Sequence, residues 1–138
     1  MNSAPESTCP PGRRDLTCGG AGLLIWIVPV IILTATAGSL PGAYLVVIWP
    51  VLLTFMGAAC LVNARRCGRR HCYVTGPFFL LLAAVSLLYG LGLLPLGPHG
   101  WRWLVEALLI GGCLLTCVPE WLFGRYVRRA NPDSGSVQ

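Results

Sequence analysis

Apolar residues along this chain gather into four long blocks separated by short polar segments. The blocks cover residues 20–38, 43–63, 77–96 and 101–123. Each block is close to the ~20 residues that a helix rising ~1.5 Å per residue needs to cross the hydrocarbon of a bilayer. Because the bilayer offers no water to the backbone, such blocks are expected to be helices. The pattern therefore predicts an all-α integral membrane four-helix bundle.

Polar segments at both ends of the chain predict tails outside this bundle. Residues 1–19 and 124–138 contain Pro, Ser and Gly, and we expect both to be flexible. The transmembrane domain then covers residues 20–123, with one long loop at 64–76. The first block is longer than the ~7–15 residue core of a signal peptide, so we expect it to be retained as a span.

Charge and composition give the expected orientation. Hydrophobic residues make up 55% of the chain and charged residues 11%, against roughly a quarter charged in soluble proteins. All ten basic residues are arginines, and only Arg102 lies outside the two tails and the loop 64–76. Cytoplasmic loops are enriched in basic residues, which predicts an N-in/C-in protein of the inner (plasma) membrane. The net charge of +5 then reflects topology and lipid contact, and no nucleic-acid partner is expected.

Seven cysteines suggest that the chain carries thiol chemistry. Two of them, Cys113 and Cys117, lie inside the fourth block. The other five fall on the predicted cytoplasmic side, and they are Cys9, Cys18, Cys60, Cys67 and Cys72. Structural disulfides are rare in the cytoplasm, so these thiols are expected to be reduced there. Soft thiolate ligands select soft metal ions, which makes binding of such an ion the leading hypothesis.

The fourth block contains the sharpest arrangement. At ~100° per residue, Glu106, Cys113, Cys117 and Glu120 fall within a stripe roughly 60° wide on one helix face. Carboxylates inside a membrane are costly and usually face the bundle interior. Cysteines four residues apart have Cβ atoms ~5–6 Å apart, so both sulfurs can hold one ion, and Hg(II) favours two sulfurs in line. The alternatives are plain packing of small thiols and a pairing of Glu106 with Arg102.

The predicted loop offers a second candidate site. Four arginines surround Cys67 and Cys72 and favour the thiolate, while His71 adds a nitrogen ligand. If the second helix continues into the loop, Cys60, Asn63 and Cys67 share one face and three sulfurs can converge. A closed zinc site is an alternative, although its spacing matches no standard zinc pattern. Its ligands would be Cys60, Cys67, His71 and Cys72. The other alternative is that these cysteines are reduced and take part in no metal binding.

This layout resembles the small bacterial mercuric-ion transport proteins of mercury-resistance systems. Those are short multi-span proteins with one cysteine pair in the membrane and another on the cytoplasmic side. The resemblance implies that Cys113 and Cys117 form the intramembrane pair and that Cys67 and Cys72 form the cytoplasmic one. It covers architecture and cysteine placement. The familiar members carry the membrane pair in the first helix, whereas the first block here has no cysteine.

We therefore expect a thiol-dependent transport or resistance protein for heavy-metal ions, Hg(II) above all. The ion would pass from the intramembrane pair to the cytoplasmic cysteines and on to a cytoplasmic thiol acceptor protein. We expect neither catalytic residues nor a resident cofactor, and no hydrolase or phosphate-loop motif is present. One alternative is a membrane thiol–disulfide oxidoreductase, against which the C-x-x-x-C spacing argues. Another is a non-catalytic membrane subunit whose basic loop docks a partner.

Overall fold

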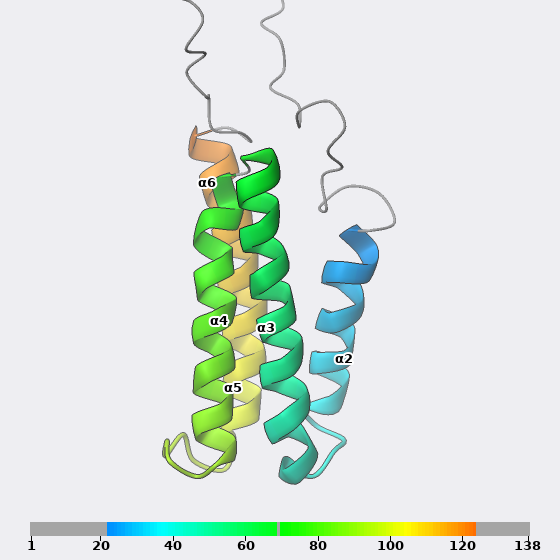
Figure 1. Cartoon of the computed structure of the whole chain (residues 1–138). Helices are drawn as coiled ribbons and strands as arrows, with labels where there is room; N and C mark the ends of the chain where they lie inside the picture. The colour runs from blue at the N-terminus through cyan, green and yellow to red at the C-terminus, as the bar shows by residue number, and fades with distance from the viewer. Residues whose placement is uncertain (1–21, 69, 124–138) are drawn as a thin grey trace, which may run out of the picture.

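The computed structural model of this chain describes residues 22–68 and 70–123 (Figure 1). Every element within these residues is helical, which confirms the all-α prediction. In chain order they are the π-helical η1 (Leu23–Ile27), α2 (Val28–Thr36), α3 (Gly42–Cys67), α4 (Arg70–Gly90), α5 (Gly100–Glu106), the π-helical η2 (Ala107–Gly111) and α6 (Gly112–Phe123). The predicted tails, 1–19 and 124–138, lie outside the described residues.

These elements form four rods, because η1 runs directly into α2 and because α5, η2 and α6 are continuous. The rods alternate in direction along the chain (Figure 1). α3 packs against α4, α4 packs against the last rod, and the first rod packs against α3. The start of η1, the α3–α4 connection and the end of α6 therefore lie at one end of the bundle.

Three helices in the described residues are long and apolar enough to cross a membrane. They are Gly42–Cys67, His71–Gly90 and Gly100–Val118. Only 11% of the most apolar window of the last one is buried inside the protein, so most of its apolar side chains face outward. The first rod is shorter than the predicted span 20–38, since its apolar helix covers Leu23–Thr36. Outward-facing apolar helices of this length are consistent with a membrane protein.

The hairpin of α3 and α4 is tighter than the sequence suggested. α3 continues to Cys67 and α4 begins at Arg70, so most of the predicted loop 64–76 is helical. Gly68 closes α3 with a left-handed φ of 69°, and its N–H donates to the Ala64 carbonyl. Arginine has a high helix propensity, and a basic last turn suits the negative end of the helix dipole. The polarity of this segment indicated a loop, but Ala64 and the four arginines in it are good helix formers.

α4 is displaced toward the N-terminus relative to the predicted span 77–96. Pro77, expected at the start of this helix, lies in its interior, and the helix ends at Gly90. In the connection that follows, Gly92 and Gly97 both have a φ of 74°. Glycine adopts such angles without steric cost, and they interrupt the helix. The last apolar residues of the predicted span therefore lie in this connection rather than in α4.

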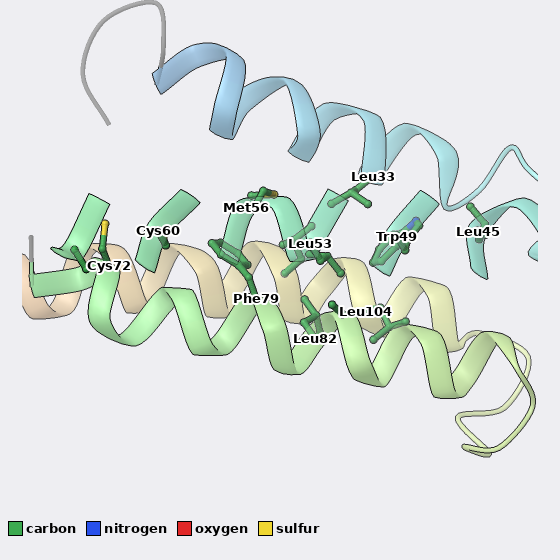
Figure 2. Close-up of a cluster of buried hydrophobic side chains, with 13 residues drawn as sticks. Leu33, Leu45, Trp49, Leu53, Met56, Cys60, Cys72, Phe79, Leu82 and Leu104 are labelled. Atoms are coloured by element: carbon green, nitrogen blue, oxygen red, sulfur yellow. The ribbon is translucent and has the colours of Figure 1, made fainter. Parts of the chain in front are cut away.

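The core follows one face of α3. Its buried residues recur at intervals of three and four and include Leu45, Trp49, Leu53, Met56 and Cys60. This spacing matches the period of an α-helix and places them along a single stripe. Figure 2 shows the stripe between the first rod and α4.

Close approach of the α3 and α4 backbones depends on glycine. A Cβ on Gly57 would lie 3.0 Å from the carbonyl oxygen of Gly76 and 2.9 Å from a carbon of the Leu80 side chain. A leucine side chain can shift, but a backbone carbonyl inside a helix cannot do so without moving α4. Small residues are common where apolar helices need to approach closely. Gly57 thus sets the distance between α3 and α4.

We predict that Gly57→Ala lowers the free energy of unfolding by about 1–3 kcal/mol, because it overpacks the α3–α4 contact. Gly38→Ala is the matched control, since Gly38 lies in a turn and an added Cβ would meet nothing within 4 Å. The measurement is thermal unfolding of both variants in detergent micelles. Equal midpoints for the two variants would show that the glycine contact does not set the helix spacing.

Candidate functional site

Two free thiols are buried where the C-terminal part of α3 meets the first turns of α4. Cys60 and Cys72 are 1% and 0% exposed, and neither forms a disulfide. Their side chains lie close enough for each to influence the other electrostatically. The Nε2 atom of the buried His71 lies 3.2 Å from the Cys72 sulfur. Figure 2 shows both cysteines on adjacent helices at one end of the buried cluster.

Hydrogen bonds fix the positions of both sulfurs. The Thr75 hydroxyl donates to the His71 carbonyl oxygen at 2.9 Å and lies 3.2 Å from the Cys60 sulfur. Because the single hydroxyl hydrogen is directed to the carbonyl, the Cys60 thiol is the donor in the second contact. The Asn63 side-chain amide donates to the Cys72 sulfur at 3.8 Å. Buried polar groups need such partners, and here two helices supply them to each other.

The third cysteine of this region is engaged differently. Cys60, Asn63 and Cys67 are all buried along α3, as expected for a helix that continues past the predicted span. Cys67 is disulfide-bonded, however, whereas Cys72 is free. The free thiols of this region are therefore Cys60 and Cys72, and Cys67 is not a second free thiol beside Cys72.

The predicted pair on the fourth rod is brought together as its spacing implied. Cys113 and Cys117 are both free and exposed on α6, one helical turn apart. The Thr116 hydroxyl, which donates to the Gly112 carbonyl at 2.8 Å, lies 4.0 Å from the Cys117 sulfur. The π-helical η2 ends at Gly111, directly before this pair. Such π segments are frequent at functional sites.

The two carboxylates of the predicted stripe contribute little to the described site. Glu106 pairs with Arg102 through a contact of 3.5 Å between Oε1 and Nε, and the two side chains are 45% and 79% exposed. Exposed pairs of this kind are worth about 0–1 kcal/mol. The Glu120 side chain lies outside the described part of the structure.

A cavity of about 420 Å³ is lined by one cysteine from each of the two regions, Cys60 and Cys113. Its polar lining comes from Cys60 of α3, His71 and Thr75 of α4, and Cys113 and Thr116 of α6. The remaining wall is mostly apolar and includes the rings of Trp26 and Phe79, whose centroids are 6.1 Å apart. The volume exceeds the ~30 Å³ share of one water molecule many times over, so an ion with ligands fits inside.

The donor atoms around this cavity suit a particular kind of ion. Among the described residues, no group of three or more His, Cys, Asp or Glu side chains is placed to hold a metal ion. The closed zinc site considered from the sequence therefore has no support here, because structural zinc takes four ligands. Each thiol pair supplies two sulfurs, and soft sulfur ligands select ions such as Hg(II) and Cu(I).

Sequence reasoning did not find the pairing of Cys60 with Cys72 or the cavity beside it. Their proximity follows from the tight hairpin, which packs the C-terminal part of α3 against the first turns of α4 and places Cys60 against Thr75. A signal for the short hairpin existed in the sequence, because Gly68 lies between two arginine pairs, which favour helices, and glycine is itself a preferred C-terminal cap. The cavity needs the packing of all four rods and leaves no local pattern in the sequence.

Comparisons with known proteins do not identify the chain. No family model matches it, and no curated protein or solved structure matches it. The resemblance to mercuric-ion transport proteins remains a hypothesis based on architecture and cysteine placement.

We predict that Thr75→Val destabilises the protein by about 1 kcal/mol or more, because it removes the acceptor of the buried Cys60 thiol. Thr75→Ser retains the hydroxyl and is expected to stay closer to wild type. Thermal unfolding in detergent micelles compares the two variants with the parent. If Val is tolerated as well as Ser, the hydroxyl contact with Cys60 does not stabilise the site.

Proposed function

We propose that this chain is a thiol-dependent transport protein for a soft metal ion, and that Hg(II) is the ion it suits best. It spans the inner (plasma) membrane of a prokaryotic cell with both termini in the cytoplasm. The three long apolar helices support insertion, since their outward faces are rich in apolar side chains. Nine of the ten arginines fall in segments that this topology places in the cytoplasm, which supports the orientation.

The observation that carries the proposal is the shared cavity. Cys60 and Cys113 belong to different rods and to different thiol pairs, yet both line this one space. Cysteines that serve only as small hydrophobic residues are not expected to line one cavity together with a histidine and two threonines. Polar and ionisable groups within apolar helices commonly mark the path of an ion.

Ligand exchange provides the transfer step. Hg(II) held by the thiolates of Cys113 and Cys117 is attacked first by the sulfur of Cys60 and then by that of Cys72. Each new mercury–sulfur bond replaces an old one, and the proton lost by the incoming thiol returns to the outgoing thiolate. The products are Hg(II) on the α3–α4 pair and two free thiols on α6. No bare ion enters the apolar interior, where an isolated charge would be very costly.

The receiving pair lies at the end of the bundle that this topology exposes to the cytoplasm. Arg65 and Arg66 form the last turn of α3 at this end, and both are exposed. From there the ion passes to a cytoplasmic thiol acceptor protein, again by exchange between thiolates. The surface charge of the arginines favours an acidic acceptor over a basic one.

One observation favours a second candidate, a membrane thiol–disulfide oxidoreductase. Cys67 is disulfide-bonded and lies on the same buried face of α3 as the free thiol of Cys60. In that reaction the free pair reduces the Cys67 disulfide, Cys60 and Cys72 become joined, and the two former disulfide sulfurs leave as thiols. This activity needs no metal, so reduction of a disulfide substrate by the metal-free protein would favour it over transport.

We predict that cells expressing the chain accumulate more Hg(II) than cells with the empty vector. Replacing one pair in Cys113→Ser/Cys117→Ser, or the other in Cys60→Ser/Cys72→Ser, is expected to return accumulation to the vector level. Both pairs are required because exchange needs a donor and a receiver. The measurement is cell-associated mercury at equal protein expression.

Met56→Leu is the matched control for this experiment. Met56 lines the same cavity and carries a thioether sulfur, and the change to Leu conserves its volume. Met56→Leu is expected to leave mercury accumulation near wild type. A thioether carries no proton, so it cannot become a thiolate that takes part in ligand exchange. Accumulation equal to the vector in all strains, the parent included, would reject mercury transport.

A further inference from the structure

We propose that the cavity between the first and last rods binds a small, neutral, planar aromatic compound that carries a hydroxyl group and reaches the protein from the bilayer. Such a ligand is not an ion, so this site goes beyond the proposed function and does not depend on metal transport.

The two π-helical segments of the described residues both border the cavity. η1 contributes Trp26 and Ile27 to its lining, and η2 contributes Leu108 and Leu109. A π-helical turn holds an extra residue relative to an α-helical one and is frequent at functional sites. The meeting of both segments at one cavity indicates a binding site rather than a defect of packing.

The cavity opens toward the lipid. Ile27 and Leu109 line it from the first and last rods, and they are 52% and 47% exposed. The first rod diverges from α3 toward this end of the bundle (Figure 1 and Figure 2). The exposed side chains on the outer faces of both rods are largely apolar. A ligand therefore enters from the hydrocarbon rather than from water.

The lining suits an uncharged ring. None of the described residues that line the cavity is Asp, Glu, Lys or Arg, and most of the wall is apolar. Trp26 and Phe79 contribute aromatic rings from two different rods, with their planes 32° apart. Aromatic rings pack favourably against another ring in stacked or edge-to-face arrangements. The volume of about 420 Å³ lies within the ~300–1,000 Å³ range of small-molecule sites.

The Thr116 hydroxyl determines which polar group the ligand carries. Its hydrogen is directed to the backbone, since Oγ1 lies 2.8 Å from the Gly112 carbonyl oxygen and 2.9 Å from that of Cys113. The Thr116 oxygen can therefore accept a further hydrogen bond but has no hydrogen left to donate. Thr75 also lines the cavity, but it is 0% exposed and already receives the Cys60 thiol. A ligand hydroxyl thus finds an acceptor at Thr116, whereas a ketone or an ether finds no hydroxyl hydrogen there.

The test is equilibrium dialysis of purified full-length protein in detergent against 2-naphthol, with protein-free micelles as the blank. Binding is expected to saturate at about one 2-naphthol per chain. Naphthalene has the same ring without the hydroxyl and is expected to bind about 3–10-fold more weakly, which corresponds to one hydrogen bond. 1-Decanol has the hydroxyl without the ring and is also expected to bind more weakly than 2-naphthol.

Thr116→Val is expected to weaken 2-naphthol binding about 3–10-fold and to leave naphthalene binding unchanged, because it removes only the acceptor. Thr34→Val is the matched control. The Thr34 hydroxyl also donates to a carbonyl four residues earlier, that of Val30, at 2.9 Å, and Thr34 is not among the residues that line the cavity. This variant is expected to bind both compounds as wild type does.

Gly112→Leu tests the location of the site. A Cβ at Gly112, which lines the cavity, would lie 3.9 Å from the Phe79 ring, so the added side chain meets no backbone. The leucine is expected to occupy the cavity and abolish saturable binding of 2-naphthol. The thermal midpoint of each ligand-free variant shows whether it is folded. Should Gly112→Leu unfold, the comparison of Thr116→Val with Thr34→Val decides.

Several results would overturn the proposal. They are no saturable binding to wild type, equal binding of 2-naphthol and naphthalene, 1-decanol binding as tight as that of 2-naphthol, equal effects of Thr116→Val and Thr34→Val, and saturable binding retained by folded Gly112→Leu. Binding of 2-naphthol by a protein that causes no mercury accumulation in cells would establish this site and reject transport. Mercury accumulation without saturable 2-naphthol binding would reject this site and leave transport in place.

Discussion

The close approach of α3 and α4 at Gly57 and Gly76 is the contact on which the rest of the structure depends. A Cβ at Gly76 would lie 2.8 Å from the Leu61 side chain and 3.4 Å from the Cβ of Cys60, so the two helices touch directly beside the first thiol. With the backbones this close, the Cys60 thiol contacts the Thr75 hydroxyl across the interface. A wider spacing would leave these polar groups without partners inside an apolar bundle, where unsatisfied groups are costly.

Features that depend on local periodicity could be predicted from the sequence. Four apolar blocks of membrane-spanning length gave the helical class and the number of rods, because length and hydropathy decide both. The adjacency of Cys113 and Cys117 was also predictable, since residues four apart always meet on a helix. Helix ends were predicted less well. Most of the segment 64–76 is polar yet helical, because arginine is a polar residue with a high helix propensity.

Features that depend on tertiary packing could not be predicted in the same way. Cys60 meets Thr75 across the interface only because α3 and α4 are joined by a very short connection after Gly68. A loop of thirteen residues, as in the predicted 64–76, would have allowed many registers between the helices. The cavity is even harder to predict from the sequence, because the first rod, α3, α4 and the last rod all contribute to its lining. The pair Cys113 and Cys117 is thus a local feature of one helix, whereas the positions of Cys60 and Cys72 depend on the packing of two helices.

The proposed chemistry unites these observations through the cost of charge in an apolar environment. A soft divalent ion bound by two thiolates is neutral, and exchange between two such pairs keeps it neutral throughout. The most direct test is anomalous X-ray scattering from crystals of the full chain loaded with Hg(II). The account predicts a mercury peak between the sulfurs of Cys60 and Cys72. Mercury bound only at other cysteines, with this pair unoccupied, would contradict it.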